Sequence, residues 1–529
     1  MKKLILIFTT IFMFVFSACT DNFLETNTNP YQISDQALQA DFNHVGAFYP
    51  TMLNNIFQDQ VAHNLANESF VRHLGTPTPF VAGRNNTTYY ITWGDPYWNG
   101  VYNNIMGPGR QVIQIAEADG YDVFVQWAKL IQVVAASRLS AYHGPIIYTN
   151  FGSPDQDILY DSEETLYNTW FQELDDVLTV FNANKDYPGM KNFDASFGGD
   201  VNKWIKVVNS YRLLLAMRLS KVDPALAKTQ GEKAIGDPGG LILTNDDGWD
   251  IFLYDGFFKP ARICFGWGDT RMSATMESVL VGYEDPRIEK FFDPATDNTL
   301  YPDHPDWPYK GIRNGAYLVA KDDRLTYSTI ASYFNGGITE RPTLTASDVH
   351  FTLAEAALRG WAGAGTAQEH YEAGVRASFD YWGAGGADAY LQDDVKLPVD
   401  YVDPKDSRND FTSRWTVTVK WDEAASNEVK LDKILTQKWI AMVHNTIEIW
   451  VDHRRTGYPK LPYNAKNDSN SDWGIIPAND FLRRMPFINN ERNNNPVGVA
   501  DATEKLGGPD EIGTRLWWDT GDYSNNFPN

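Results

Sequence analysis

The sequence predicts a mostly α-helical protein in which stacked helix pairs form one superhelical scaffold and long irregular loops connect them. Two observations support this prediction. In several long segments apolar residues recur at a spacing near 3.6, which is typical of helices with one buried face. Between these segments lie long stretches rich in Gly, Pro, Asp and aromatic residues, which favour turns and loops. A helical body with an irregular surface is therefore expected.

Two early segments carry the helical spacing most clearly. The first runs from Phe124 to Leu139, and the second runs from Val201 to Leu219. Each is predicted to be an amphipathic helix. Leu431 to Trp450 carries a broad apolar side at the same spacing and is predicted to form another long helix.

A helix pair is predicted in the second half of the chain. Ser347-Asp348 can cap a helix that extends to Trp361, and Gly363 to Gly365 break the pattern. A second helix then follows from Gln368 to Trp382. The pair spans about 35 residues, the length of a tetratricopeptide unit, although the consensus residues of that repeat are only partly matched. The expected scaffold is therefore a stack of such pairs.

One region departs from the helical pattern. Residues from about 237 to 346 are rich in Gly, Pro, Asp and aromatics, as in Asp237-Pro238-Gly239-Gly240, and similar composition returns at Gly383 to Thr412 and after Tyr458. Long irregular segments on a rigid scaffold commonly carry binding groups. The binding surface is therefore expected on these loops.

The N-terminus has the organisation of a lipoprotein signal. Lys2 and Lys3 precede an apolar run from Leu4 to Phe16, and small residues lead to Cys19. The run is shorter than the roughly 20 residues that a transmembrane helix needs. We predict a signal peptide over residues 1–18, a lipid-modified Cys19 with a polar tether over 19–34, and a single domain over 35–529. The alternative is an ordinary signal-peptidase site in which Cys19 has no special role.

The charge and the cysteines restrict the possible partners. The formal net charge is −23, which disfavours nucleic acid and anionic membrane surfaces. The only cysteines are Cys19 and Cys264. If Cys19 is lipidated, one thiol is left and no internal disulfide can form. The exported domain must then be stabilised by its core.

Sharp catalytic signatures of the common hydrolase, nucleotide-binding and metalloprotease kinds do not occur in the sequence. This does not exclude an enzyme, because a glycosidase needs only two carboxylates at the right separation. The pairs Glu163-Glu164 and Asp175-Asp176 are interpreted as a solvated helix face. The stretch Asp468 to Gly474 has alternating oxygen ligands like a calcium loop, but its Gly comes one place late. No metal or cofactor is predicted.

Aromatic residues are the more promising functional signal, since the chain has 17 Trp, 27 Tyr and 29 Phe. Flat apolar rings next to amide, carboxylate and guanidinium groups suit carbohydrate, whose C–H faces stack on rings while its hydroxyls form hydrogen bonds. Such a mixture occurs between residues 84 and 99 and on the loops after residue 260. The predicted ligand-binding residues are Arg84, Tyr90, Trp93, Trp98, Asn99, Trp267, Trp307 and Tyr309.

Each of these aromatic groups also has a structural interpretation. Trp98, Tyr102 and Ile105 have helical spacing, so that part of the first group can belong to the core. The loop aromatics, among them Trp267 and Trp307, can instead pin their loops to the helical body.

Several motifs together resemble the SusD/RagB family of outer-membrane lipoproteins. Thr436 to Ala441, followed by Glu448 to Pro459 with its Arg454-Arg455-Thr456-Gly457 run, is the strongest of them. Three further motifs are similar to segments of the family: Ala141-Tyr142-His143-Gly144-Pro145-Ile146, Val349 to Gly360, and Leu482 to Phe487 with Glu491. The arginines also have a local explanation, because cations stabilise the end of a helix and Gly457 can adopt a left-handed cap. They are therefore interpreted as structural.

The resemblance implies a helical domain of tetratricopeptide-like pairs, tethered to the outer membrane and facing the cell exterior. It also implies a partnership with a TonB-dependent transporter of the SusC type. Family members bind oligosaccharides, or in some branches peptides, and deliver them without cleavage. A surface glycoside hydrolase and a purely structural transporter partner are the alternatives. The substrate itself is not identified by the sequence.

Overall fold

The computed structural model describes residues 39–57, 60–93, 97–253, 259–336 and 340–528. The predicted signal peptide, Cys19 and the tether over 19–34 lie outside the described residues. The chain divides into two compact units, Met1–Ala47 and Phe48–Asn529. The described part of the first contains η1 (Ala40–Phe42) and α4 (Asn43–Gly46). All remaining elements belong to the second unit.

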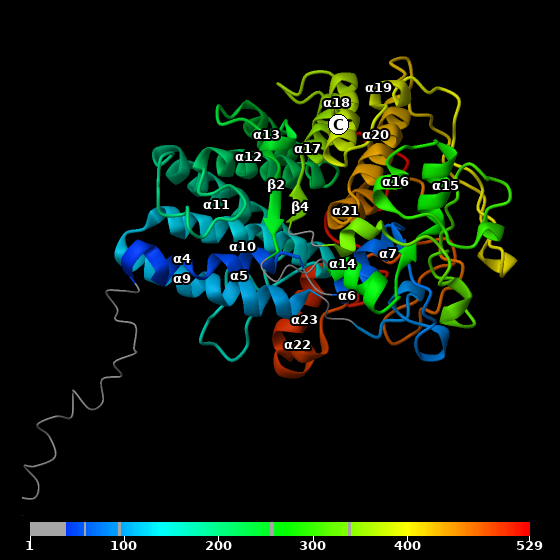
Figure 1. The fold of residues 1–529 in the computed structure, drawn as a ribbon. Coiled ribbons are helices and arrows are strands. Elements are labelled where there is room, and N and C mark those ends of the chain that lie inside the picture. The colour runs from blue at the N-terminus through cyan, green and yellow to red at the C-terminus, as the bar shows by residue number, and fades with distance from the viewer. Residues whose placement is uncertain (1–38, 58–59, 94–96, 254–258, 337–339, 529) are drawn as a thin grey trace, which may run out of the picture. The chain divides into compact units, whose positions relative to one another are not determined.

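The first half of the second unit contains a row of helices, each of which packs on the next one along the chain (Figure 1). They are α9 (Gly107–Asp119), α10 (Asp122–His143), α11 (Glu163–Ala183), α12 (Val201–Arg218) and α13 (Pro224–Gly236). Side chains of Ser162, Asp200 and Asp223 accept hydrogen bonds from the first-turn N–H groups of α11, α12 and α13. The helices predicted near 124–139 and 201–219 are confirmed.

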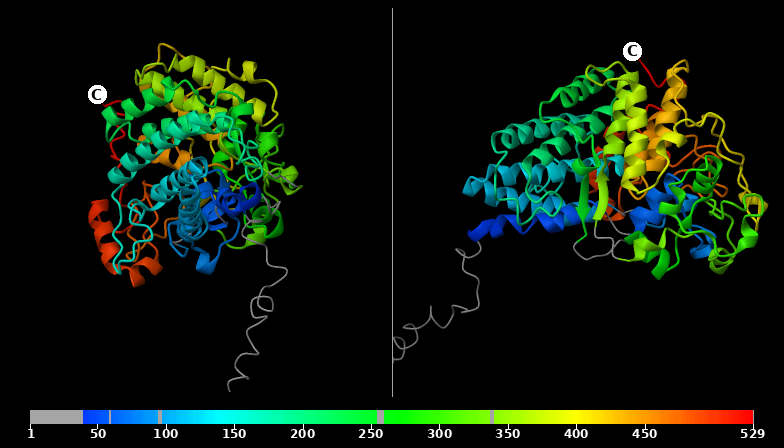
Figure 2. Two further views of the ribbon diagram at one scale, coloured as in Figure 1. Left: turned by 90° about the vertical axis from the view of Figure 1, so that its left-hand side faces the viewer. Right: turned by 45° about the horizontal axis from the view of Figure 1, so that its top comes forward.

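The predicted helix pair is α17 (Ala346–Leu358) with α18 (Ala367–Tyr381), which pack along each other (Figure 2). The cap of α17 differs from the prediction. Thr345 occupies the N-cap, and its hydroxyl accepts a hydrogen bond from the N–H of Asp348 at 3.2 Å. The first helical turn therefore includes Ser347 and Asp348. Helix α17 also packs on α12 and α20, so that the pair continues the helical row.

The prediction of one helix over Leu431 to Trp450 is wrong, because two helices occupy this segment. Helix α20 (Asn427–Ala441) ends before a break, and α21 (Ile447–Thr456) follows it. His444 adopts a left-handed conformation with φ 68° in the break. The Arg341 guanidinium donates two hydrogen bonds to the His444 carbonyl, and Asn445 Nδ2 donates to the Thr343 carbonyl. Arg341, from a distant segment, thus satisfies a carbonyl that a continuous helix would have paired internally.

The cation-rich end of α21 is structural, as predicted. Arg455 is fully buried and donates to both carboxylate oxygens of Glu355 at 2.6 and 2.7 Å. Arg454 is buried too, and its guanidinium donates to the carbonyls of Ala141 and Arg483. Gly457 adopts the left-handed cap with φ 75°. The motif that carried the family resemblance therefore ties helices together across the core.

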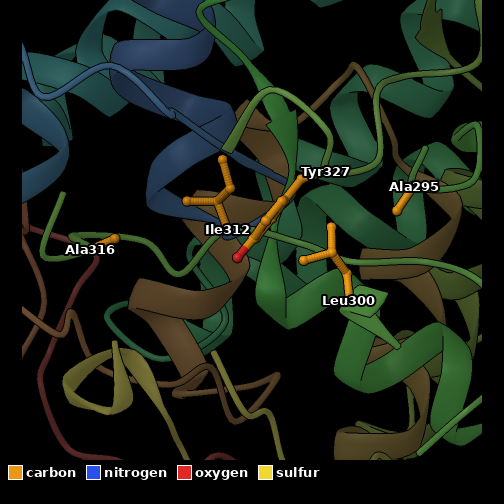
Figure 3. Packing of buried hydrophobic residues seen from close by; sticks show 5 residues of the cluster. All are labelled: Ala295, Leu300, Ile312, Ala316 and Tyr327. Carbon is orange, nitrogen blue, oxygen red and sulfur yellow. The ribbon is translucent and has the colours of Figure 1, made fainter. Parts of the chain in front are cut away.

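The region between 237 and 346 is irregular but contains elements that the sequence pattern did not predict. Strands β2 (Trp249–Phe252) and β4 (Glu340–Leu344) form an antiparallel pair, and so do β1 (Leu74–Gly75) and β3 (Arg271–Met272). Helices α15 (Ala274–Gly282) and α16 (Ile288–Phe291) follow β3. A local core anchors the loops (Figure 3), and it consists of Ala295, Leu300, Ile312, Ala316 and Tyr327.

Short elements complete the second unit. The helices among them are α5 (Tyr49–Asn54), α6 (Gln60–Ala62), α7 (Glu68–Phe70), α8 (Trp98–Val101), α14 (Lys259–Ala261), α19 (Ala387–Tyr390), α22 (Asn489–Asn494) and α23 (Pro496–Leu506). Single turns of other helix types include η4 (Asn86–Thr88), η7 (Arg262–Gly266) and η10 (Ser332–Asn335). Throughout the described ranges, no helix combines the length and the hydropathy needed to cross a bilayer.

Candidate functional site

The loop over residues 76–93 is held in a strained local conformation. Phe80, Ala82 and Tyr89 have positive φ values of 49°, 53° and 66°. Such left-handed geometry costs non-glycine residues about 1–3 kcal/mol each and persists only where the surroundings fix it. Asn85 caps the turn η4, because its side chain accepts from the Thr87 N–H at 2.7 Å. Strain of this kind is concentrated at binding sites, so that the loop is a candidate.

A buried amide fixes the position of Trp93 in this loop. Asn86 is fully buried, and its Oδ1 accepts hydrogen bonds from the N–H groups of Thr92 at 3.0 Å and Trp93 at 3.3 Å. Its Nδ2 donates to the Trp93 carbonyl at 2.8 Å. The Trp93 ring is partly exposed and meets the Phe80 ring edge-on at 5.5 Å. The partly exposed ring therefore stands on a fixed backbone.

The loop is also anchored to a segment nearly four hundred residues away. Asn464 Nδ2 donates to the Thr87 carbonyl at 2.8 Å, and Lys466 Nζ donates to the Gly83 carbonyl at 2.8 Å. The Asp468 N–H donates to the Thr88 carbonyl at 2.7 Å. These bonds preorganise the loop, which lowers the entropy cost of binding a ligand.

Arg84 and Tyr90 form an exposed pair on the same loop. The guanidinium carbon of Arg84 lies 4.4 Å from the centroid of the Tyr90 ring. Arg84 is exposed and Tyr90 is partly exposed. A cation held over an aromatic face at such a site contributes about 0.5–1 kcal/mol. The pair therefore presents a hydrogen-bond donor beside a partly fixed ring.

A hydrogen-bonded junction joins this loop to the segment that carries Trp267. The Thr78 hydroxyl donates to Asp269 Oδ1 at 2.5 Å. Lys321 Nζ donates to the same carboxylate at 2.6 Å and to the Trp267 carbonyl at 2.5 Å. Trp267 is 43% exposed, and the Arg262 guanidinium lies 5.2 Å from its ring. We call Phe80, Arg84, Tyr90, Trp93 and Trp267 the aromatic surface.

The prediction that Trp98 contacts ligand is wrong. Its side chain is only 3% exposed, and it packs against Tyr102, His143 and Tyr160 with ring centroids 5.2 to 5.8 Å apart. Trp98 is therefore a core residue of α8, in agreement with the helical spacing of Trp98, Tyr102 and Ile105. Its neighbour Asn99 is exposed.

The predicted loop residues Trp307 and Tyr309 have different environments. Tyr309 is 5% exposed, and burial, together with Glu289 and Asp293, raises the pKa of its hydroxyl to about 12. It is a packing residue, and the prediction that it binds ligand is corrected. Trp307 is partly exposed. The carbonyl of the following residue, Pro308, accepts a hydrogen bond from the N–H of Ala295, which belongs to the local core. Trp307 thus belongs to the loop packed on the local core of Figure 3.

Comparisons with known proteins agree with this architecture. Residues 25–519 match the model of the SusD-like family, described as SusD and RagB outer membrane lipoproteins. The chain belongs to this family. A chitin-binding SusD homologue from Flavobacterium johnsoniae is 39% identical, with a TM-score of 0.84, covering 92% of this chain and all of the other. A SusD homologue from Bacteroides vulgatus is 33% identical, with a TM-score of 0.83 and coverages of 91% and 99%.

A SusD-like protein from Bacteroides thetaiotaomicron is 29% identical, with a TM-score of 0.81, and the match covers 90% of this chain and 98% of the other. Among curated proteins, none matches the chain. These three solved structures are described as SusD-like or as SusD homologues, and each match extends over nearly the whole length. The mostly helical fold predicted from the sequence is therefore confirmed.

The carboxylate pairs of this SusD-family chain are not one solvated face. Glu163 is 3% exposed and accepts a hydrogen bond from the Trp517 N–H at 2.8 Å, which corrects the prediction. Asp175 is paired with Arg212 at 2.5 Å and Lys233 at 2.6 Å. Asp468, the first residue of the stretch that resembled a calcium loop, pairs with Lys466 at 2.9 Å. No group of three or more metal-ligating side chains is found within the described ranges.

The sequence did not identify the groups that shape the aromatic surface. The sequence places Asn86 only within a mixture of polar and aromatic residues. Its hydrogen bonds to the backbone of Thr92 and Trp93 form only when the loop is folded. Thr78 and Asp269 are 191 residues apart in the chain. Nothing in their local sequence marks them as partners.

Proposed function

We propose that this SusD-family chain binds oligosaccharides at the aromatic surface and delivers them to a TonB-dependent transporter of the SusC type. The family model describes outer membrane lipoproteins. A lipid on Cys19 would tether the domain to the outer membrane, facing the cell exterior. The chain would bind its cargo without cleaving it.

The observation that supports this proposal most directly is the junction of Thr78 with Asp269. It joins the loop of Trp93 to the segment of Trp267, so that two segments with exposed rings are held together. Pyranose rings stack their C–H faces on such side chains. Arg84 supplies donors for hydroxyl groups beside them. Rings on fixed backbones with adjacent polar groups are the combination that carbohydrate requires.

The ligand class proposed first is oligomers of N-acetylglucosamine. The Flavobacterium johnsoniae relative is described as chitin-binding, and it is 39% identical over its whole length. A β-linked sugar chain also presents an apolar face at each ring, which suits a row of aromatic side chains. A peptide ligand is the second candidate, because the family resemblance implies that some branches bind peptides.

The decisive experiment is calorimetric titration of residues 20–529 with N-acetylglucosamine oligomers of increasing length, with starch, mannan and peptide probes in parallel. Saturable binding of one glycan class is expected, and Trp93→Ala and Trp267→Ala are each expected to weaken it by about tenfold or more. Trp517→Ala is the matched control, because this Trp is also partly exposed but packs against Tyr167.

Three other results would redirect the proposal. Binding of peptides alone would favour the second candidate. Release of reducing ends would establish a hydrolase and overturn delivery without cleavage. Glycan binding that survives both substitutions would place the site away from the aromatic surface.

A further inference from the structure

A second open site lies apart from the residues of the aromatic surface. It is a cleft of about 560 Å³ between α16, η10, the β2–β4 pair and α18. Clefts of this size are typical of small-molecule sites. Its walls combine aromatic rings with carboxylates, and they are formed by Asp250, Glu289, Lys290, Tyr333, Phe334, Glu340, Pro342, Tyr381, Trp382 and His444.

Tyr333 provides a fixed and exposed ring in this cleft. Its ring stacks on Phe334 with centroids 4.3 Å apart and planes at 27°. Its hydroxyl donates to the Lys290 carbonyl at 2.8 Å. Even so, the side chain is 48% exposed. A large ring that is held at both ends and still exposed loses little entropy when a ligand covers it.

Trp382 is held in the wall beside this ring. Its Nε1 donates to the Ala441 carbonyl at 3.3 Å, and its ring meets Phe291 edge-on at 5.1 Å and Phe334 at 6.2 Å. It remains partly exposed. The aromatic wall is therefore continuous from Tyr333 through Phe334 to Trp382.

The opposite wall carries acidic groups on the paired strands. Asp250 lies on β2, and Glu340 begins β4 opposite Phe252. The Tyr381 hydroxyl lies 3.2 and 3.3 Å from the two oxygens of Asp250 and donates to that carboxylate. Glu340 is exposed, and its carboxylate lies close enough to Asp250 to raise the pKa of that group. The two carboxylates of this wall therefore repel each other.

The remaining charged groups of the cleft leave it acidic. Glu289 adds a third carboxylate, and among the described residues that line the cleft Lys290 is the one lysine. Burial, with nearby Arg341 and His73, lowers the pKa of His444, so that its imidazole is neutral at pH 7. Burial and Glu340 raise the pKa of Asp250 to about 6 against the lowering effect of Tyr381, so that Asp250 is ionised above that pH. A cationic ligand would relieve the repulsion.

We propose that this cleft binds a protonated amino sugar, with the sugar ring stacked on Tyr333 and the ammonium group between Asp250 and Glu340. An ammonium group forms charge-assisted hydrogen bonds with carboxylates and is attracted to aromatic faces. A neutral or acetylated sugar would leave the repulsion between the acids in place. The class of ligand rests on the proposed glycan function, whereas the preference for a free amine rests on the cleft.

The test compares two probes of equal length, a glucosamine oligomer and an N-acetylglucosamine oligomer, by calorimetry at low salt and pH 6.5. The glucosamine oligomer is expected to bind the cleft. Asp250→Asn and Glu340→Gln are each expected to weaken its binding by about tenfold, and Tyr333→Ala is expected to do the same. Glu504→Gln, which removes an exposed acid from α23, is the matched control and should leave binding unchanged.

The outcomes separate this proposal from the proposed function. If the cleft variants lose glucosamine binding and retain N-acetylglucosamine binding, both sites are supported. Equal glucosamine affinity in Glu340→Gln, Asp250→Asn and Glu504→Gln would overturn the cleft proposal and leave the aromatic surface untouched. Tighter binding of a lysine peptide than of the glucosamine oligomer would overturn the assignment to an amino sugar. Thermal unfolding of each variant verifies that the fold is intact.

Discussion

The buried side-chain amide of Asn86 clamps the backbone of Trp93 in both directions, accepting a hydrogen bond from its N–H and donating one to its carbonyl. Asn86→Ala would remove both bonds and leave the Trp93 backbone without these partners. We expect a loss of about 1–3 kcal/mol in the free energy of unfolding. We also expect weaker glycan binding, because the Trp93 ring would no longer be fixed.

Calorimetric titration and denaturant unfolding of Asn86→Ala measure the two effects. Asn489→Ala, an exposed asparagine on α22, is the control. A variant that binds glycan as tightly as the parent protein would show that the clamp does not serve the aromatic surface.

Trp98 and Trp267 should respond to substitution in opposite ways, although both were expected to bind ligand. Trp98 is buried, so that Trp98→Ala creates a cavity and should cost about 3–5 kcal/mol of stability. Trp267 is 43% exposed, so that Trp267→Ala should leave the melting temperature nearly unchanged while binding weakens. Differential scanning calorimetry with and without glycan separates the two. Equal loss of stability in both variants would contradict the assignment of Trp267 to an exposed surface.

Much of the fold could be predicted from the sequence because its helices carry their own signal. The apolar spacing within 124–139 and 201–219 corresponds to α10 and α12. The break at His444 could not be predicted in this way. The carbonyl of His444 accepts a hydrogen bond from Arg341, which lies 103 residues away in the sequence. The spacing of apolar residues within one segment contains no information about such a distant partner. The β2–β4 pair was missed for a similar reason, since each strand is short and its partner is distant.

The candidate site could be predicted only in part. Aromatic content and position indicated Trp93 and Trp267, which are both exposed to some degree. The same signal also indicated Trp98 and Tyr309, which are buried. Composition cannot distinguish these cases, because an aromatic residue serves a core and a sugar-binding surface equally well. Exposure decides between them, and exposure depends on tertiary packing.

The buried ion pair between Arg455 and Glu355 is expected to be a major stabilising contact between α17 and α21. Burial alone would raise the pKa of Glu355, but Arg455 and Arg359 lower it to about 2. Glu355→Gln removes the countercharge from buried guanidinium groups and should cost about 3–5 kcal/mol. Urea unfolding at pH 7 measures this cost.

Exposed Glu117→Gln on α9 is the matched control for Glu355→Gln, and it should change stability by less than about 0.5 kcal/mol. The Glu355 contribution is present above its unfolded pKa near 4.5 and is lost as the pH falls toward 2. A Glu355→Gln protein as stable as the control variant would show that the ion pair does not hold the helices together.

Glu163 should make stability fall as the pH rises, which is the reverse of Glu355. Burial raises the pKa of Glu163 from 4.5 to about 7 even though the Trp517 N–H and two arginines lower it. The folded state therefore favours the protonated carboxyl. The loss of folding stability caused by the buried Glu163 begins above the unfolded pKa of 4.5. It grows until the pH passes 7 and is then constant. The size of the full penalty is about 3 kcal/mol at most.

Glu163→Gln removes this titration while its side-chain oxygen can still accept from the Trp517 N–H. We expect the variant to gain stability relative to the parent protein between pH 5 and pH 8, by up to about 2 kcal/mol. The neighbouring Glu164→Gln, which removes an exposed carboxylate from the same helix, is the matched control. A stability difference between Glu163→Gln and the parent protein that does not grow with pH would show that the pKa of Glu163 is not raised in the folded state, because a raised pKa makes this difference grow as the pH rises.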